Sequence, residues 1–422
     1  MSLTSLELLR FLLEFALLLA VARLLGDIAR RLKQPQVIGE LLTGVVIGPS
    51  ILGAFFPVMY HTLFPTHGVQ GLLLQLISQL GVIFLLLLSG LETQINIVRQ
   101  YTRLSIVISA CGVIVSFAAG YVLATLLPRS LMANPTQHTA FLLFVATAIS
   151  MSAIPVIVKI LIDMNLIARQ FGQLILAIGI VTDTTGWFLL SFITGIATSQ
   201  HLPIKSLLFS MFGTLAFAVF CFTIGYLMIR YSLEWIKKQF DGESPVLSSI
   251  ILSSVIVIGL AGAAVTQWLG VEAFLGAFLV GIQMARVSHI TNEALPQLRG
   301  LTIAVFAPVF FASAGLKVNL TQMNSVDMLL IMLAVIGVAT VSKFFGTYIG
   351  ARVAGLTHWA AIGLGSALNA RGAVEIIVAT IGLQMGILTT QMYTIIVIMA
   401  VATSMMAPPL LRWSLRHQTE MG

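Results

Sequence analysis

The sequence predicts an all-α integral membrane protein with about thirteen transmembrane helices. Of its 422 residues, 58% are hydrophobic and only 9% are charged, whereas a soluble domain carries about 25% charged residues. The apolar residues gather into runs of about 20, the length that a helix needs to cross a hydrocarbon core of about 30 Å. Because the runs do not alternate with the period of a membrane β-barrel, we expect every span to be helical.

Thirteen apolar runs can be distinguished along the chain. The first has neither a basic leader nor a small-residue cleavage site, so we expect it to be retained as a helix. The odd number of spans places the two termini on opposite sides of the membrane. The runs cover approximately residues 4–25, 35–55, 71–90, 103–127, 138–162, 168–199, 204–230, 246–267, 270–286, 300–317, 326–352, 357–384 and 389–412.

The basic residues between the runs predict the orientation. Segments on one side of the membrane hold fourteen Lys and Arg residues, and segments on the other side hold three. Since cytoplasmic loops carry the excess of basic residues, we expect an outside N-terminus and a cytoplasmic C-terminus, in a plasma membrane such as the bacterial inner membrane. The fourteen are Arg30, Arg31, Lys33, Arg99, Arg103, Arg169, Arg230, Lys237, Lys238, Arg286, Arg299, Arg352, Arg412 and Arg416; the three are Arg129, Lys205 and Lys317.

The fifth run, residues 138–162, carries a helix breaker near mid-depth. Pro155 lacks an N–H group, so a carbonyl one turn earlier loses its helical partner. Thr147, Ser150 and Ser152 lie just upstream, and hydroxyls together with freed carbonyls can replace the water around a small cation. A harmless kink is the alternative, because Pro and Gly are common in membrane helices.

The twelfth run is interrupted in a similar way. Gly363, Gly365, Asn369 and Gly372 weaken the helix around its centre. Non-helical backbone at this depth is tolerated only where protein buries it or where it lines a water-filled cavity. We therefore expect a second break here.

The two interrupted runs occupy matching positions in the chain. Each is the fifth of a set of six, and the sets cover about residues 4–199 and 246–412, with a linker helix at about 204–230. Because one span separates the sets, the second enters the membrane from the opposite side. Interrupted helices at matching positions of inverted repeats indicate a binding site. The chain is thus expected to form a single membrane transporter domain of two inverted repeats.

One acid, Asp183, lies in the middle of the apolar run 168–199. A charge at the centre of a membrane helix costs about 2.5–3.5 kcal/mol on insertion scales, and such groups are usually functional. Lys343, near the middle of the run 326–352, is a natural counter-ion if the two helices meet. An acid that holds either a cation or a proton provides the competition that exchange requires. The alternative is an ion pair that only holds two helices together.

Three further charged residues give weaker signals. Arg371 and Glu375 lie four residues apart beside the break of the twelfth run, and Glu375 falls where a helix dipole favours an anion. We expect both to support the broken helices, as do Pro155 and Asn369. Glu40 lies near the cytoplasmic end of the second run and could line a funnel for incoming ions or cap a helix.

Seven segments that run the length of the chain are specific together although each is weak alone. They are PQVIGELLTGVVIGPSILG (35–53), LLLLSGLETQIN (85–96), ATAISMSAIPVIVKIL (146–161), GQLILAIGIVTDTTGW (172–187), FLGAFLVGI (274–282), FAPVFFASAGLKVNL (306–320) and LNARGAVEIIVATIGLQMGIL (368–388). In these segments the sequence resembles the second monovalent cation:proton antiporter family, which contains the Kef-like and plant CHX-like transporters.

The resemblance implies thirteen helices in the sodium/proton antiporter fold, with inverted repeats and two broken helices that cross. It also implies a homodimer in which a core domain moves against a dimerisation domain in an elevator-like cycle. Family members carry the cation on an aspartate at the position of Asp183 and have a basic residue at that of Lys343. Many have Asp or Asn before the aspartate, whereas this chain has Thr182, which adds a hydroxyl but no charge to the expected pocket.

We therefore expect secondary active exchange of Na⁺, or of K⁺ or Li⁺, for H⁺, with no enzymatic activity and no cofactor. The cation or the proton is expected to bind at Asp183, with Thr182, Thr147, Ser150 and Ser152 nearby. The expected partners are the lipid bilayer and a second copy of the chain, and no nucleic acid.

Two alternatives to this function stay open. One is a channel-like potassium efflux transporter, and the other is an ion-coupled carrier of a small organic solute. The scarcity of polar residues around Asp183 favours a small inorganic substrate. Kef-type systems append a cytosolic nucleotide-binding domain, and since this chain ends about ten residues after its last run, we expect it to have no such regulatory domain.

Overall fold

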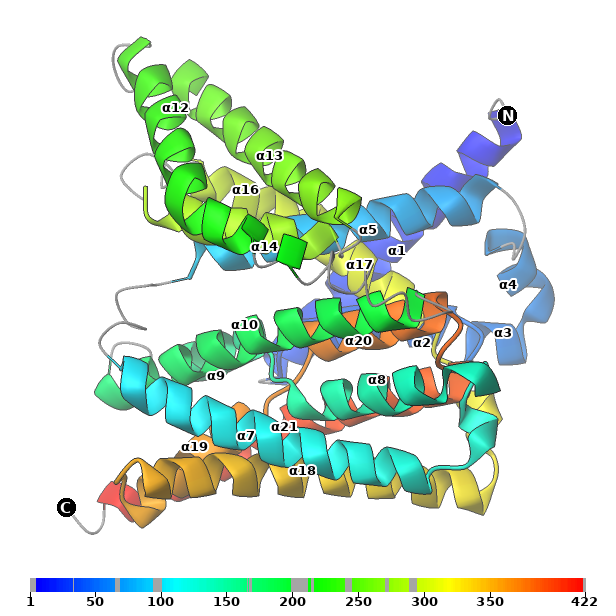
Figure 1. Ribbon diagram of the computed structural model, residues 1–422. Helices are drawn as coiled ribbons and strands as arrows, with labels where there is room; N and C mark the ends of the chain where they lie inside the picture. The colour runs from blue at the N-terminus through cyan, green and yellow to red at the C-terminus, as the bar shows by residue number, and fades with distance from the viewer. Residues whose placement is uncertain are drawn as a thin grey trace. The chain divides into compact units, whose positions relative to one another are not determined.

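The computed structural model confirms an all-α membrane protein (Figure 1). Among the residues that it describes, nine helices are long and apolar enough to cross a membrane, and two shorter apolar helices accompany them. The predicted runs that are not among the nine are the first, the ninth and the two interrupted ones. The structure describes residues 5–32, 34–64, 69–93, 101–164, 166, 169–198, 212–213, 216–239, 245–269, 273–287 and 294–419.

The helices follow the predicted order along the chain. The continuous ones are α1 (Ser5–Arg31), α2 (Gln36–Ile47), α3 (Leu52–Phe55), α4 (Pro57–Leu63), α5 (Val69–Leu91), α7 (Thr102–Leu126), α10 (Gln170–Thr198), α12 (Tyr226–Gln239), α13 (Pro245–Trp268), α14 (Ala273–Ala285), α16 (Leu295–Leu301), α17 (Ala307–Gly315), α18 (Val326–Val353) and α21 (Thr390–Thr419). A π-helical turn, Cys221–Gly225, leads directly into α12, and another, Thr302–Phe306, joins α16 to α17.

Both predicted breaks are confirmed. The fifth run forms α8 (His138–Ser150) and α9 (Ile154–Asp163), separated by three non-helical residues. Pro155 lies in the first turn of α9, where a missing N–H leaves no helical hydrogen bond unmade. The twelfth run forms α19 (His358–Leu368) and α20 (Ala373–Gln384), separated by four residues.

The predicted linker helix differs in its limits. Of the predicted residues 204–230, residues 204–211, 214 and 215 lie outside the described residues, and the described span runs from Ala216 to Gln239. It continues past the predicted end because polar residues can prolong a helix beyond the apolar core. Arg230 and Glu234, for example, form an ion pair of 2.7 Å one turn apart. Hydropathy marks the edge of the membrane core, and the helix ends further on.

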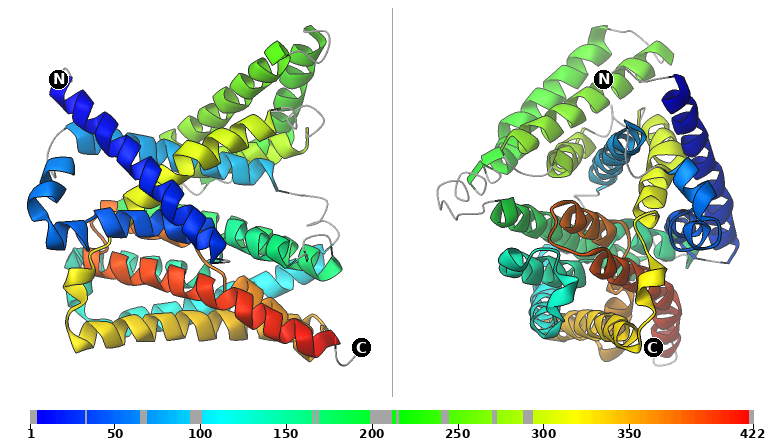
Figure 2. Two further views of the ribbon diagram at one scale, coloured as in Figure 1. Left: turned by 180° about the vertical axis from the view of Figure 1, so that it is seen from behind. Right: turned by 90° about the vertical axis from the view of Figure 1, so that its right-hand side faces the viewer.

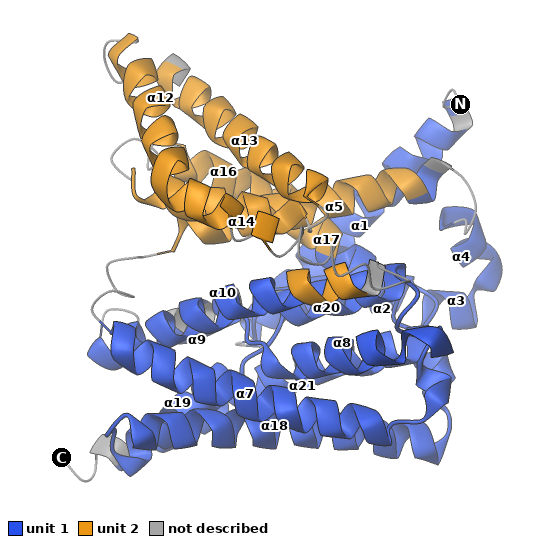
Figure 3. Cartoon of the chain, viewed as in Figure 1, with its two compact units in different colours: residues 1–71, 96–190, 311–422 blue, residues 72–95, 191–310 orange. Residues whose placement is uncertain are grey.

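The packing of the helices divides the chain into two compact units (Figure 3). Unit 1 comprises Met1–Gly71, Asn96–Leu190 and Phe311–Gly422, and unit 2 comprises Leu72–Ile95 and Ser191–Phe310. Both broken spans belong to unit 1, as does the part of α10 that carries Asp183. The predicted division into inverted repeats describes a different property, and it stays a prediction.

Within unit 1, α7 and α18 run side by side (Figures 1 and 2). Two glycines of α18 allow the close approach. A Cβ atom on Gly346 would lie 2.9 Å from the carbonyl oxygen of Cys111, and one on Gly350 would lie 2.9 Å from Cα of Ile108. Close helix packing of this kind depends on small residues. It fixes the position of α18 and therefore of Lys343, which α18 carries.

Candidate functional site

The two broken helices are joined at their breaks. The backbone N–H of Ala153 donates to the carbonyl of Ala370 over 3.2 Å. The Ser152 hydroxyl donates to the carbonyl of Leu368 over 2.7 Å. We call this junction, residues 150–153 and 368–372, the helix crossing. Its bonds satisfy polar backbone groups that each break removes from its own helix.

One face of α10 packs against the first break and carries Asp183. Gly179, Asp183 and Gly186 share this face, because residues three and four apart lie on one side of a helix. A Cβ atom on Gly186 would lie 2.6 Å from Cε of Met151, and one on Gly179 would lie 3.7 Å from Cγ1 of Ile154. Asp183 lies between these two contacts.

The Asp183 carboxylate is buried and incompletely paired. The residue is only 2% exposed, and its Oδ1 atom has no hydrogen-bond partner. The indole of Trp187, one turn along α10, and the charges of Glu375 and Lys343 act on it. An ionised carboxylate in such a place needs a proton or a cation to offset its lost hydration.

Lys343 contacts the first break from the side of α18. It is 1% exposed, and its ammonium donates to the carbonyl of Ser150 over 2.5 Å. Among the described ion pairs none joins it to Asp183, although the two charges act on each other, and the role of Lys343 as charge partner stays a prediction. The C-terminal end of α8 attracts the ammonium because it offers unpaired carbonyls and the negative end of a helix dipole.

Arg371 joins the second break to the first. Its guanidinium donates to the carbonyls of Ala148, in α8, and Ala339, in α18, over 2.9 Å each. The side chain is fully buried. Sequence reasoning expected Arg371 to support its own break and missed this bridge. The only signal in the sequence was an arginine at mid-membrane depth.

The second break is also held by an acid and a hydroxyl. The backbone N–H of Gly372 donates to Oε2 of Glu375 over 2.7 Å, so this carboxylate caps the start of α20. Ser404, in α21, accepts from the backbone N–H of Arg371 over 3.2 Å and donates to its carbonyl. Sequence reasoning gave no role to Ser404, because nothing in the apolar run around it indicates which helix it meets.

The four predicted hydroxyls have different surroundings. The Ser150 hydroxyl donates to the carbonyl of Thr147 over 3.0 Å, and Ser152 is engaged in the crossing. The Thr147 hydroxyl is buried and has no hydrogen-bond partner. The Thr182 hydroxyl donates over 3.1 Å to that of Ser109, in α7. Of the four, Thr147 is the one whose hydroxyl has no hydrogen bond among the described residues, whereas Thr182 bonds to a neighbouring helix.

Asn369 is a buried side chain of the crossing that lacks hydrogen-bond partners. It is fully buried, and neither its amide oxygen nor its amide nitrogen has a hydrogen-bond partner. Leaving one buried polar group unpaired costs about 1–3 kcal/mol. Nothing in the described hydrogen bonds uses this amide to hold the break.

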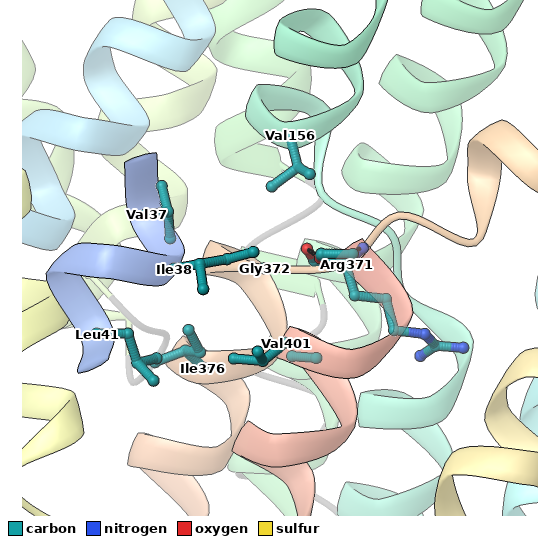
Figure 4. Close-up of a pocket in the computed structure, with 10 residues that line it drawn as sticks. Val37, Ile38, Leu41, Val156, Arg371, Gly372, Ile376 and Val401 are labelled. Carbon is teal, nitrogen blue, oxygen red and sulfur yellow. Dashed lines mark hydrogen bonds between the residues drawn. The ribbon is translucent and has the colours of Figure 1, made fainter. Parts of the chain in front are cut away.

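A small cavity lies beside the second break (Figure 4). Its volume is about 10 Å³, roughly what one water molecule requires. In Figure 4 the guanidinium of Arg371 points away from Ile38 and Val401, so the cavity has an almost entirely apolar lining. The lining residues are Val37, Ile38, Leu41, Val156, Arg371, Gly372, Ile376, Ala400, Val401 and Ser404.

Glu40 does not line this cavity, although it belongs to the same helix, α2. It is 3% exposed, and the charge of Arg23, in α1, acts on it. A role for Glu40 in an ion funnel therefore stays a prediction.

The free oxygens of the site suit a small monovalent ion. A carboxylate oxygen, a hydroxyl and an amide are buried beside two helix breaks, with two cationic side chains bound nearby to carbonyls. Among the described residues, no three His, Cys, Asp or Glu side chains are grouped as a transition-metal site requires.

Comparisons with known proteins agree with this chemistry. The profile of a family described as "Sodium/hydrogen exchanger, transmembrane" matches residues 16–417. The chain is 30% identical over 404 residues to the Na(+)/H(+) antiporter NhaS4 of Synechocystis sp., covering 96% of each. It is 30% identical to K(+)/H(+) antiporter 1 of Saccharomyces cerevisiae, covering 95% of this chain but 46% of that protein.

A solved structure shares the fold. The sodium proton antiporter MjNhaP1 from Methanocaldococcus jannaschii superposes with a TM-score of 0.69 at 16% identity, covering 97% of this chain and 99% of that one.

Proposed function

Because this chain belongs to the sodium/hydrogen exchanger family and is a monovalent cation/proton antiporter, we propose that Asp183 is the carboxylate on which its cation and its proton alternate. The observation that supports this is a buried Asp183 with a free Oδ1 atom, on the face of α10 that packs against the first break. One carboxylate in a tight pocket binds a cation or a proton, but not both. Exchange follows if the loaded forms cross the membrane and the empty charged form does not.

Lys343 is proposed as the mobile charge of the site. With no cation bound, its ammonium is held by one carbonyl, that of Ser150, and a cation arriving at Asp183 repels it. If only Asp183 gains and loses a proton, one proton exchanges for one cation and no net charge moves. If Lys343 also releases its proton, two protons exchange for one cation and transport is electrogenic.

We also propose how the cycle is organised. The site lies within unit 1, which supports an elevator-like cycle in which this unit carries the ion. We take Na⁺ as the preferred cation because the relative named for Na⁺ is matched over 96% of its own length. K⁺ and Li⁺ are the alternatives, since a relative named for K⁺, matched over 46% of its length, is also 30% identical. A homodimer in a bacterial inner membrane, with an outside N-terminus and a cytoplasmic C-terminus, completes the proposal.

The test is reconstitution in sealed vesicles that contain a pH dye. Na⁺, K⁺ and Li⁺ are titrated with and without an ionophore that clamps the voltage. Asp183→Asn should lower exchange at least about 100-fold, because a neutral amide cannot bind a cation and a proton in turn. Asp327→Asn, which alters an exposed acid in the first turn of α18, is the control and should retain full exchange.

Two checks accompany this measurement. The melting temperature and the elution volume of Asp183→Asn should match those of the wild type, so that lost exchange reports on the site alone. Undiminished exchange in that variant would remove Asp183 from the mechanism. Cation flux that follows the cation gradient without proton counterflow would favour the channel-like alternative. Uptake of an organic solute driven by the same ions would favour the carrier.

A further inference from the structure

The helix crossing contains an amide side chain, that of Asn369, which makes none of the hydrogen bonds that hold the crossing together. Asn369 follows the last residue of α19, and the backbone around it is held by other groups. Ser152 bonds to Leu368, Ala153 bonds to Ala370, and Ser404 bonds to the backbone of Arg371. Glu375 caps the next half-helix. The side chain of Asn369 takes part in none of these bonds.

The amide is nevertheless placed at the depth of the crossing and sealed from solvent. Asn369 is fully buried, and both polar atoms of its amide lack partners. Buried polar groups in native proteins are almost always hydrogen-bonded, so an exception requires a reason. A structural role would use the amide, and a packing role would be served better by an apolar side chain of similar size. Neither explains an asparagine here.

A short series of contacts connects Asn369 to the site of exchange. Its neighbour Leu368 accepts the hydrogen bond from Ser152. The residue before Ser152, Met151, contacts the α10 face at Gly186, one turn from Asp183. These contacts link the second break, which carries Asn369, through the first break to the helix that carries the carboxylate.

An amide is suited to bind a cation that enters and leaves the site in each transport cycle. Its oxygen can bind a monovalent cation without adding charge to the pocket. Its NH₂ group can bond to a carboxylate once the cation has left. A carboxylate at this position would bind both cation and proton and would change the stoichiometry, whereas the amide brings neither a charge nor a proton that it exchanges.

We propose that Asn369 supplies a neutral oxygen ligand to the transported cation and sets the affinity and the preference among monovalent cations. The inference rests on the proposed function, since it requires that the cation binds at Asp183. It assigns to the second break a direct role in cation binding, in addition to its structural role in the crossing.

The experiment measures the apparent KM for Na⁺ and for K⁺ in the vesicle assay, with Asn369→Ala, Asn369→Ser and Asn369→Asp. Asn369→Ala should raise the KM of the preferred cation about tenfold, with a maximal rate within about threefold of the wild type. Tenfold corresponds to about 1.4 kcal/mol. Asn369→Ser keeps an oxygen on a shorter side chain, so its KM for the preferred cation should lie between those of the wild type and Asn369→Ala. Asn369→Asp should change the ratio of the KM values for Na⁺ and K⁺.

A second measurement does not depend on transport. In detergent, Na⁺ is added to the purified protein and the melting temperature is recorded. If Na⁺ binds the native state, the melting temperature rises with its concentration. Asn369→Ala should need about ten times more Na⁺ for the same rise. Ser366→Ala is the matched control, because Ser366 is buried in the same half-helix and its hydroxyl bonds within that helix.

The outcomes separate the two proposals. Loss of exchange in Asp183→Asn with unchanged KM values in the Asn369 variants would overturn the role of Asn369 and leave that of Asp183. Exchange that survives Asp183→Asn would overturn the proposed function itself. A lower melting temperature with unchanged KM values, or failure of all three variants to fold, would show that the amide is structural and would also overturn the inference.

Discussion

The two helix breaks are held in different ways. At the first break, carbonyls at the end of α8 accept hydrogen bonds from Arg371 and Lys343, which are charged and belong to distant parts of the chain. At the second break, Glu375 of the adjoining half-helix and the neutral hydroxyls of Ser152 and Ser404 bind the backbone.

Under the proposed function, the difference predicts which break responds to an ion. A cationic side chain on a helix carbonyl can be displaced by another cation, because the two compete for the same negative end of a helix dipole. A neutral hydroxyl, or a carboxylate that caps a helix N-terminus, does not compete with a cation in this way. The first break is therefore suited to sense the ion, and the second to keep the crossing in register. Asn369 is the exception that we propose for the second break.

The largest effect is expected from Arg371, which connects the breaks. Arg371→Met removes the hydrogen bonds to the carbonyls of Ala148 and Ala339 and the positive charge that acts on the buried Glu375. Leaving a buried charge uncompensated costs about 3–5 kcal/mol. We expect a melting temperature far below that of the wild type, a low yield of folded protein and no exchange, measured by thermal unfolding in detergent and by the vesicle assay.

Two variants sharpen this result. Arg371→Lys keeps the charge but has one ammonium for two carbonyls on different helices. Its melting temperature should therefore lie between those of the wild type and Arg371→Met. Arg412→Met, at an exposed position of α21, should change stability by no more than about 0.5 kcal/mol. A melting temperature of Arg371→Met within a few degrees of the wild type would show that the breaks do not depend on each other.

A smaller effect is expected from Lys343, which bonds to the first break alone. Lys343→Met keeps the length of the side chain and removes one hydrogen bond to a charged donor, which is worth about 1.5–3 kcal/mol. The melting temperature should fall, but less than in Arg371→Met, and the pH profile of exchange should change because a charge acting on Asp183 is gone.

The control for Lys343 is Lys238→Met, at an exposed position of α12, which should leave both readouts unchanged. If Lys343→Met unfolds more easily than Arg371→Met, then the ammonium, and not the guanidinium, is the main support of the first break. If neither stability nor the pH profile changes, Lys343 has no part in the site.

The sequence predicts the breaks well because their causes are local. Pro155 cannot continue a helix, and the Gly and Asn residues of the twelfth run weaken one. The depth of Asp183 and Lys343 follows from counting apolar residues. What cannot be predicted is which groups of adjacent helices meet, because that depends on rotation and crossing angle. Lys343 therefore bonds to a carbonyl that no sequence pattern marks, and Arg371 reaches a helix more than two hundred residues away.

The smallest effect is expected from Thr182, which neighbours Asp183 in sequence but bonds to α7. Thr182→Val removes the hydrogen bond to Ser109, while Ser109 still donates to the carbonyl of Ile178 over 3.0 Å. We expect a loss of about 0.5–1.5 kcal/mol in stability and unchanged KM values for Na⁺ and K⁺. Thr185→Val is the matched control, because the Thr185 hydroxyl bonds only within α10, to Val181. A changed cation preference in Thr182→Val would mean that residue 182 contacts the ion, and the ion would then touch two neighbouring residues of α10 as well as the first break.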